Sequence, residues 1–167
     1  RYSYLDATYR AAADLASGER TLAVRPGTRI AGLPRHTAKL TASWQVNDAA
    51  AVAMDLIGAS AVGTVGNEDG RIEDRTDTAD ASVDASVAGY FVANLRGSYR
   101  FDRHFSINGG VSNLLDTRYS TFAALATDLF PSGTLVQPHA APAEALTARF
   151  AAPGAPRAFY VALRYQY

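Results

Sequence analysis

The sequence predicts an all-β protein, namely the wall of an antiparallel, up-and-down transmembrane β-barrel. Three observations predict this class. Apolar and polar residues alternate with a period of two along six segments, as on strands whose two faces meet different surroundings. Short and long connections alternate between the segments, as in outer-membrane barrels with short periplasmic turns and long external loops. No segment approaches the ~20 apolar residues of a membrane helix, since aspartates enclose the longest clean apolar run, Ala49 to Met54.

Six strands are expected, in chain order at residues 3–10, 36–46, 51–58, 91–101, 105–114 and 157–167. Each has roughly the length that crosses a membrane as a tilted strand. The third is the weakest, because Ile57 interrupts its polar face. In the same order, the apolar face carries Leu5, Ala7 and Tyr9; Ala38, Leu40, Ala42, Trp44 and Val46; Val52, Met54 and Leu56; Phe91, Ala93, Leu95, Gly97, Tyr99 and Phe101; Phe105, Ile107, Gly109 and Val111; and Phe159, Val161, Leu163, Tyr165 and Tyr167.

The opposite face favours a wet lumen over a soluble β-sandwich, whose half-buried strands also alternate. It carries charges in mid-strand, on Lys39, Arg96, Arg100 and Arg164. We expect neighbouring carboxylates, rather than a substrate, to balance the arginines. Aromatic residues gather near the short-turn or C-terminal end, where a membrane barrel places an interfacial girdle: Trp44, Tyr99, Phe101, Phe105, Tyr165 and Tyr167.

Three long connections, at about residues 11–34, 63–89 and 115–156, hold most of the glycine, proline and acidic residues. The second contains a run of carboxylates: Glu68, Asp69, Glu73, Asp74, Asp77, Asp80 and Asp84. These favour a solvated acidic loop over a calcium site, because the EF-hand spacing is absent. Aromatic rings and a histidine lie in or near the outer connections, and none of them alone identifies a substrate-binding residue: Tyr2, Tyr119, Phe122, Phe130 and His139.

Composition argues against an enzyme. The 167 residues contain no cysteine, which excludes disulfides, thiol nucleophiles and cysteine-based metal sites. The three histidines, His36, His104 and His139, fall in separate connections, and no catalytic or phosphate-binding spacing occurs. The 16 basic and 16 acidic side chains cancel, so nucleic acid is not an expected partner. No cofactor or metal is expected, and the first residues show no signal-peptide pattern.

The segment from Val111 to Tyr119 contains Asn113, Leu114, Leu115, Asp116 and Tyr119. It resembles the "NLFD-x-x-Y" segment near the end of TonB-dependent outer-membrane receptors, with Leu115 in place of the usual phenylalanine. Residues 3–9 (SYLDATY) are similar to that family's "Y-T-Y-L-D-A" strand, and residues 30–36 (IAGLPRH) to its "I-P-G-x-P-x-H" entry. A proline-arginine pair at 156–157 leads into a last strand that ends in an aromatic residue, as in the family.

The resemblance implies a 22-stranded barrel with a plug in its lumen. Residues 1–167 are then a fragment, the last six strands or so, with the plug, TonB box and signal peptide upstream. The implied function is TonB-dependent uptake of a scarce nutrient across the bacterial outer membrane, above all a ferric siderophore. Implied partners are outer-membrane lipid, the TonB complex through the upstream plug, the chelate, and the barrel-assembly machinery. The barrel-assembly machinery would recognise the alternate apolar residues of the final strand: Phe159, Val161, Leu163, Tyr165 and Tyr167.

Two alternatives of other classes stay open. A passive porin or structural outer-membrane barrel would share the strand pattern but lack energy coupling, and the upstream sequence would distinguish it. A soluble all-β binding module would bury its alternate apolar face in a dry interior. The positions of Leu40, Leu95, Val111 and Leu163 decide between the barrel and the soluble module.

Overall fold

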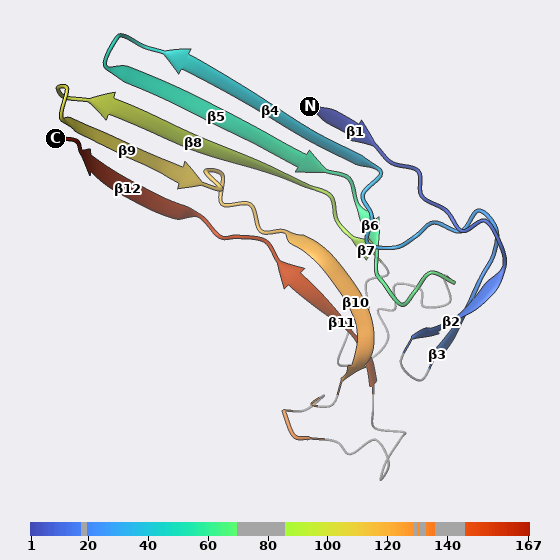
Figure 1. The fold of residues 1–167 in the computed structure, drawn as a ribbon. Coiled ribbons are helices and arrows are strands. Elements are labelled where there is room, and N and C mark those ends of the chain that lie inside the picture. Colours follow the sequence, from blue (N-terminus) through green and yellow to red (C-terminus); the bar gives the residue numbers. More distant parts are fainter. Residues whose placement is uncertain (18–19, 70–85, 129, 131–132, 136–145) are drawn as a thin grey trace.

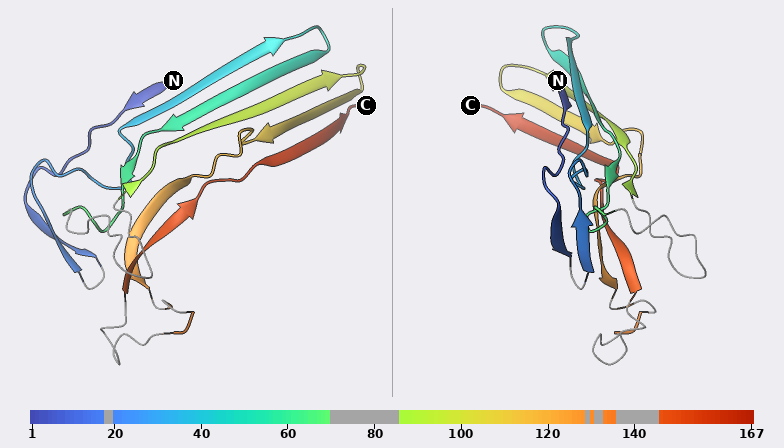
Figure 2. Two further views of the ribbon diagram at one scale, coloured as in Figure 1. Left: turned by 180° about the vertical axis from the view of Figure 1, so that it is seen from behind. Right: turned by 90° about the vertical axis from the view of Figure 1, so that its right-hand side faces the viewer.

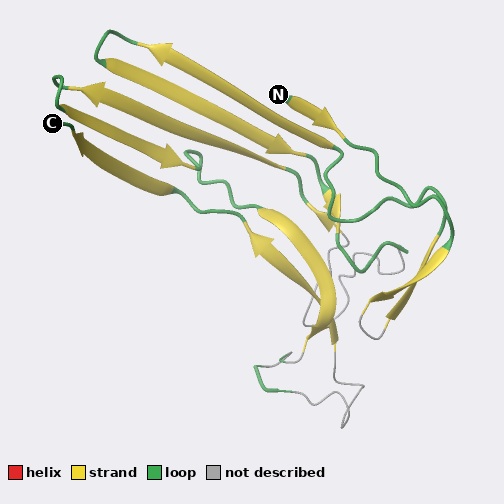
Figure 3. Cartoon of the chain, in the orientation of Figure 1, coloured by secondary structure: helices red, strands yellow, loops and turns green. Residues whose placement is uncertain are grey.

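A computed structural model describes residues 1–17, 20–69, 86–128, 130, 133–135 and 146–167. All regular elements in these ranges are strands (Figure 3), which confirms the predicted all-β class. In chain order they are β1 (Tyr2–Tyr4), β2 (Ala13–Ser17), β3 (Arg20–Val24), β4 (His36–Gln45), β5 (Ala50–Ala59), β6 (Val62–Gly63), β7 (Ser86–Val87), β8 (Tyr90–Arg100), β9 (Phe105–Ser112), β10 (Ser120–Asp128), β11 (Leu146–Pro153) and β12 (Ala158–Tyr165). The described residues include no helix that is long and apolar enough to cross a membrane.

Six strands form one open antiparallel sheet in the order β1-β4-β5-β8-β9-β12. Consecutive long strands are neighbours (Figure 1), so the up-and-down topology is confirmed. The sheet is curved when it is seen from the side (Figure 2). Because β1 and β12 are its two edges, the sheet does not close on itself.

The register confirms the two predicted faces on β4, β5, β8, β9 and β12. On β1 it reverses them, because Tyr2 and Tyr4 pair with Ala38 and His36 on the apolar face, whereas Tyr4 was predicted on the opposite face. Paired residues of antiparallel strands share a face, and the pairs Leu40–Leu56, Leu95–Val111 and Ile107–Leu163 place the apolar residues together. Leu40 is 60% exposed and Leu163 is 65% exposed. The apolar face therefore forms a continuous outer surface instead of a dry interior, as a lipid-facing wall requires.

The two short connections lie at one end of the sheet, together with the C-terminus, and the long connections lie at the other (Figure 1). An Asx-type turn closes each short connection, because its side-chain oxygen accepts backbone hydrogen bonds. Asn47 accepts from the N–H groups of Ala49 and Ala50, both at 2.8 Å. Asp102 accepts from those of His104 at 2.7 Å and Phe105 at 2.9 Å. The predicted separation of short and long connections is thus confirmed.

The predicted first strand at residues 3–10 is wrong in its extent, because β1 ends at Tyr4. After Leu5, whose N–H donates to the carbonyl of Arg35, the facing segment reaches Pro34, which has no N–H to continue the ladder. Pairing resumes only as an isolated bridge between Thr8 and Arg29. Three further pairs of strands occur in connections that were predicted as loops: β2–β3, β6–β7 and β10–β11.

The three long connections contact one another near the sheet. Gly32 of the first donates its N–H to the carbonyl of Gly63 in the second, at 3.0 Å. Val65 of the second forms a parallel bridge with Ala124 in β10 of the third. Gly32 has φ +75°, and a Cβ there would lie 3.2 Å from Val65 Cγ2 and 3.3 Å from Phe122 Cε2. A side chain at this position would therefore be both strained and crowded.

Candidate functional site

The polar face of the sheet carries one compact charged network. Asp55 in the middle of β5 is 8% exposed. Its Oδ1 accepts a hydrogen bond from Thr41 Oγ1 at 2.5 Å, and its Oδ2 lies 3.2 Å from a guanidinium nitrogen of Arg96. Arg100, nearer the turn, donates to the carbonyl of Asp48 at 2.7 Å. Arg96 is therefore balanced by a neighbouring carboxylate, as expected, and Arg100 fastens a turn.

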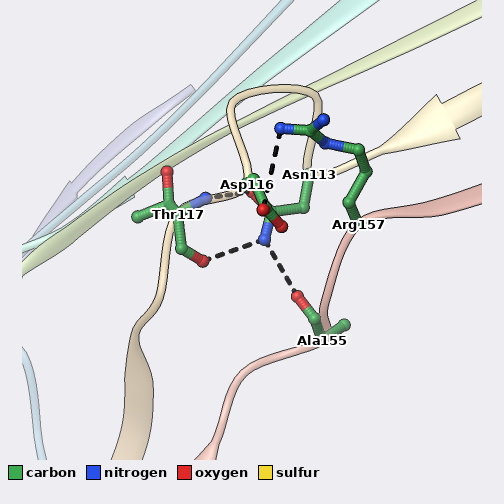
Figure 4. Close-up of polar contacts among 5 residues, drawn as sticks. All are labelled: Asn113, Asp116, Thr117, Ala155 and Arg157. Atoms are coloured by element: carbon green, nitrogen blue, oxygen red, sulfur yellow. Dashed lines mark hydrogen bonds and ion pairs between the residues drawn. The ribbon is translucent and has the colours of Figure 1, made fainter.

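A second polar site lies where the wall ends and the third long connection begins. Asn113 is 2% exposed and has φ +50°, a conformation that asparagine tolerates better than most residues. Its Nδ2 donates to the carbonyls of Thr117 at 2.9 Å and Ala155 at 3.1 Å, and its Oδ1 accepts from the Thr117 N–H at 2.9 Å (Figure 4). One side chain therefore joins both ends of the connection that contains β10 and β11.

The other residues of this motif reinforce the same junction. Leu114 donates its N–H to the carbonyl of Ala93 in β8 at 2.7 Å. Asp116, with φ +54°, donates its N–H to the Asn113 carbonyl, and its carboxylate lies 3.8 Å from the guanidinium of Arg157 (Figure 4). Leu115 is 59% exposed. The loss of phenylalanine at this exposed position therefore leaves the turn intact.

Tyr119, the last motif residue, lies against two other segments. Its ring centroid is 4.5 Å from that of Tyr90, with the rings tilted by 33°. Its carbonyl accepts a hydrogen bond from Gly154 at 2.7 Å. A Cβ at Gly154 would overlap the Tyr119 ring, so the absence of a side chain at Gly154 makes room for the ring.

A cleft of about 550 Å³ opens beside this tyrosine pair, between the start of β8 and the lead-in to β10. Arg149 of β11 reaches across and donates to the carbonyl of Ser86 at 3.2 Å. The cleft is lined by Ser86, Val87, Ala88, Gly89, Tyr90, Thr117, Arg118, Tyr119, Ser120 and Arg149. It lies at the end of the wall where the long connections are.

Comparison with known proteins decides the family. The model of the family described as "TonB dependent receptor-like, beta-barrel" matches residues 1–114. The chain belongs to this family. No curated protein sequence matches it. TonB-dependent receptor barrels are outer-membrane proteins, and the family comprises receptors and transporters rather than enzymes.

Three solved receptors show the same fold. The siderophore receptor PiuA from Acinetobacter baumannii matches 99% of this chain with a TM-score of 0.66 and 15% identity. The ferric-catecholate import receptor Fiu from E. coli K12 matches 79% of this chain with a TM-score of 0.51 and 20% identity. The ferric enterobactin receptor PfeA from Pseudomonas aeruginosa matches 79% of this chain with a TM-score of 0.51 and 21% identity. The chain spans 19%, 15% and 16% of their respective lengths.

The last strand of this receptor chain, β12, presents its alternate apolar residues outward. Phe159, Val161, Leu163 and Tyr165 are between 63% and 73% exposed. One edge of β12 pairs with β9, and its other edge has no partner strand within the described residues. Tyr167 follows β12 and lies near Tyr165, with ring centroids 5.5 Å apart.

The predicted aromatic girdle lies at the short-turn end of the apolar face. Rings lie close together there: the centroids of Tyr99 and Phe101, at the end of β8, are 4.9 Å apart, and those of Phe101 and Phe105, at the start of β9, are 5.3 Å apart. Trp44 is 69% exposed on the same face. In the adjacent turn, the hydrogen bonds from His104 and Phe105 hold the pKa of Asp102 below its ordinary value of 3.8.

The other predicted residues do not form one site. Tyr2 belongs to the apolar face, where its hydroxyl lies 2.6 Å from His36 Nδ1. Phe122 packs at Gly32, and His139 lies outside the described residues. Of the acidic run, Glu68 accepts a hydrogen bond from the Gly66 N–H at 3.0 Å, and residues 70–84 also lie outside the described part. Within that part, no cluster of three or more metal-ligating side chains occurs.

Sequence reasoning missed Gly154, the ion pair between Arg157 and Asp116, and the cleft beside Tyr119. A lone glycine, and an arginine that lies far along the chain from Asp116, give no local pattern. The proline-arginine lead-in at 156–157 marked the correct segment, and only the fold brings Arg157 to Asp116.

Proposed function

We propose that this chain is the C-terminal part of the barrel of an outer-membrane receptor that imports a scarce nutrient, a ferric siderophore, with energy supplied through TonB. The observation that carries the proposal is the open sheet with one apolar face, one polar face and all its long connections at one end. A lipid-facing wall around a wet channel needs this division. Membership of the TonB-dependent receptor family supports the energy coupling.

The siderophore is supported by the names of similar structures. PiuA, Fiu and PfeA are described as siderophore, ferric-catecholate and ferric enterobactin receptors. The small share of their length that this chain spans supports the assignment of residues 1–167 to one part of a larger barrel, with a plug in another part of the protein. Unpaired strand edges in lipid are costly, so the free edges of β1 and β12 require further strands.

Uptake of labelled iron by cells that produce the full-length receptor tests the proposal. Iron-starved cells should accumulate ferric siderophore only when both the receptor and TonB are present. Uptake that persists without TonB would contradict the energy coupling and favour a passive porin. If a panel of ferric siderophores gives no receptor-dependent uptake while another nutrient is imported through TonB, the substrate assignment is wrong and the receptor class stands.

We further propose that β12 and Tyr167 form the strand that the barrel-assembly machinery reads. The free edge of β12 offers backbone hydrogen bonds, and the alternate residues Phe159, Val161 and Leu163 offer side chains for recognition. Deletion of Tyr167 from the full-length receptor should lower the amount of heat-modifiable barrel in the outer membrane. Tyr2→Ala, an exposed tyrosine at the opposite sheet edge, is the control. Equal amounts of folded barrel with and without Tyr167 would refute this role.

A further inference from the structure

We propose that the cleft beside Tyr90 and Tyr119 is a subsite for an anionic aromatic group, such as an aryl carboxylate carried by the imported ligand. The inference rests on the proposed function only for the source of that group. The cleft itself is defined by its lining. Its volume of about 550 Å³ falls in the range of about 300–1,000 Å³ that small-molecule sites occupy.

The lining of the cleft favours an anion. Among the described residues of the lining, seven of ten carry side-chain hydrogen-bond donors and none carries a carboxylate: the seven are Ser86, Tyr90, Thr117, Arg118, Tyr119, Ser120 and Arg149. Two of these seven residues are arginines, so the described part of the lining has a formal charge of +2 from Arg118 and Arg149. A guanidinium binds a carboxylate through two parallel hydrogen bonds.

The two arginines have different roles in this site. Arg149 is held at the rim by its hydrogen bond to the Ser86 carbonyl. Arg118 is exposed, and the structure shows no ion pair for it within the described part of the chain. Arg118 is therefore the group that we assign to contact the anion. An arginine whose charge already had a carboxylate partner would attract an anionic ligand much less.

The aromatic part of the subsite is fixed before any ligand arrives. The ring of Tyr119 packs against Gly154, which has no side chain and so leaves room for it. The same ring contacts that of Tyr90, with a centroid distance of 4.5 Å. Thr117 lies two residues before Tyr119, and Asn113 forms hydrogen bonds with both its N–H and its carbonyl. A site that is already ordered loses less entropy on binding, and tyrosine rings stack with aromatic ligands.

Three small probes separate charge from ring: benzoate has both, acetate has only the charge, and benzyl alcohol has only the ring. Binding to the purified full-length receptor in detergent is measured by ligand-detected NMR titration. Benzoate should bind more tightly than acetate or benzyl alcohol, and Arg118→Gln should raise its Kd about tenfold or more. Arg103→Gln, in the short turn at the far end of the wall, is the matched control and should leave the Kd unchanged.

The subsite is refuted if benzoate does not bind, if acetate binds as well as benzoate, or if Arg118→Gln binds benzoate as the parent does. Uptake measurements keep this result apart from the proposed function. TonB-dependent siderophore uptake with no benzoate site would refute the subsite alone. A benzoate site that depends on Arg118, in a receptor without TonB-dependent siderophore uptake, would refute the proposed function alone.

Discussion

Replacement of Asn113 by alanine should loosen the junction between the wall and its third long connection. The change removes three side-chain hydrogen bonds, to the Thr117 N–H, the Thr117 carbonyl and the Ala155 carbonyl. Each is worth about 0.5–1.5 kcal/mol net. Alanine at φ +50° adds about 1 kcal/mol of backbone strain. The expected loss is therefore about 2.5–5.5 kcal/mol of local stability, or a protection factor lower by about two to four orders of magnitude.

Hydrogen exchange followed by mass spectrometry on the full-length receptor measures this loss, in peptides that cover residues 114–119 and 153–156. Asn113→Gly separates the two contributions, because it loses the same bonds but removes the strain. It should be less destabilised than alanine by about 1 kcal/mol. Asn108→Ala, which changes an exposed asparagine in the strand that precedes Asn113, is the control. Unchanged exchange in Asn113→Ala would refute the assignment of the junction to this side chain.

Three other substitutions test separate contacts. Hydrogen bonds lower the pKa of Asp102 in the folded protein. Its carboxylate therefore stabilises the turn above pH ~4, and this stabilisation is lost as the pH falls through the lower folded pKa. Thermal unfolding midpoints measured between pH ~5 and ~2 should depend less on pH in Asp102→Asn than in the parent. Gly154→Ala should cost about 1–3 kcal/mol by crowding Tyr119, and Tyr119→Ala should recover part of the loss in a double-variant cycle of unfolding free energies. Arg96→Gln breaks an ion pair on the wall and should lower the urea midpoint more than Arg164→Gln, which breaks none among the described residues.

The sequence was sufficient to predict the two faces of β4, β5, β8, β9 and β12, because the strand period fixes them locally, but on the short edge strand β1 the faces are the reverse of the prediction. Every pairing between Leu40, Leu56, Ala93 and their neighbours joins residues that alternation alone had assigned to one face. Strand ends were less predictable, because pairing depends on a second segment. Residues 3–10 alternate throughout, but the ladder stops where Pro34 enters the facing segment.

The strands of the long connections show a different limit. Val62, Val87 and Ala123 form a small buried cluster from three separate segments. β6 and β7 have only two residues each, too few for a period, and β10 carries an unbroken apolar run from Phe122 to Ala126 in place of an alternation. The contacts that order these segments are long-range, so only the completed fold reveals them.

The Asn113 motif lies where backbone pairing of the wall stops. Up to Ser112, β9 pairs with β12 through backbone hydrogen bonds. Beyond Ser112 the two segments separate, and pairing begins again between β10 and β11. Backbone groups at such a fork lose their ladder partners and need others when they are buried. The Asn113 amide offers both a donor and an acceptor. Its Nδ2 donates to the carbonyls of Thr117 and Ala155, on the two diverging segments, and its Oδ1 accepts from the Thr117 N–H. Aspartate would lose the donors, and leucine would lose all three bonds. The fork therefore requires an asparagine for reasons that the alternating pattern of the strands does not contain.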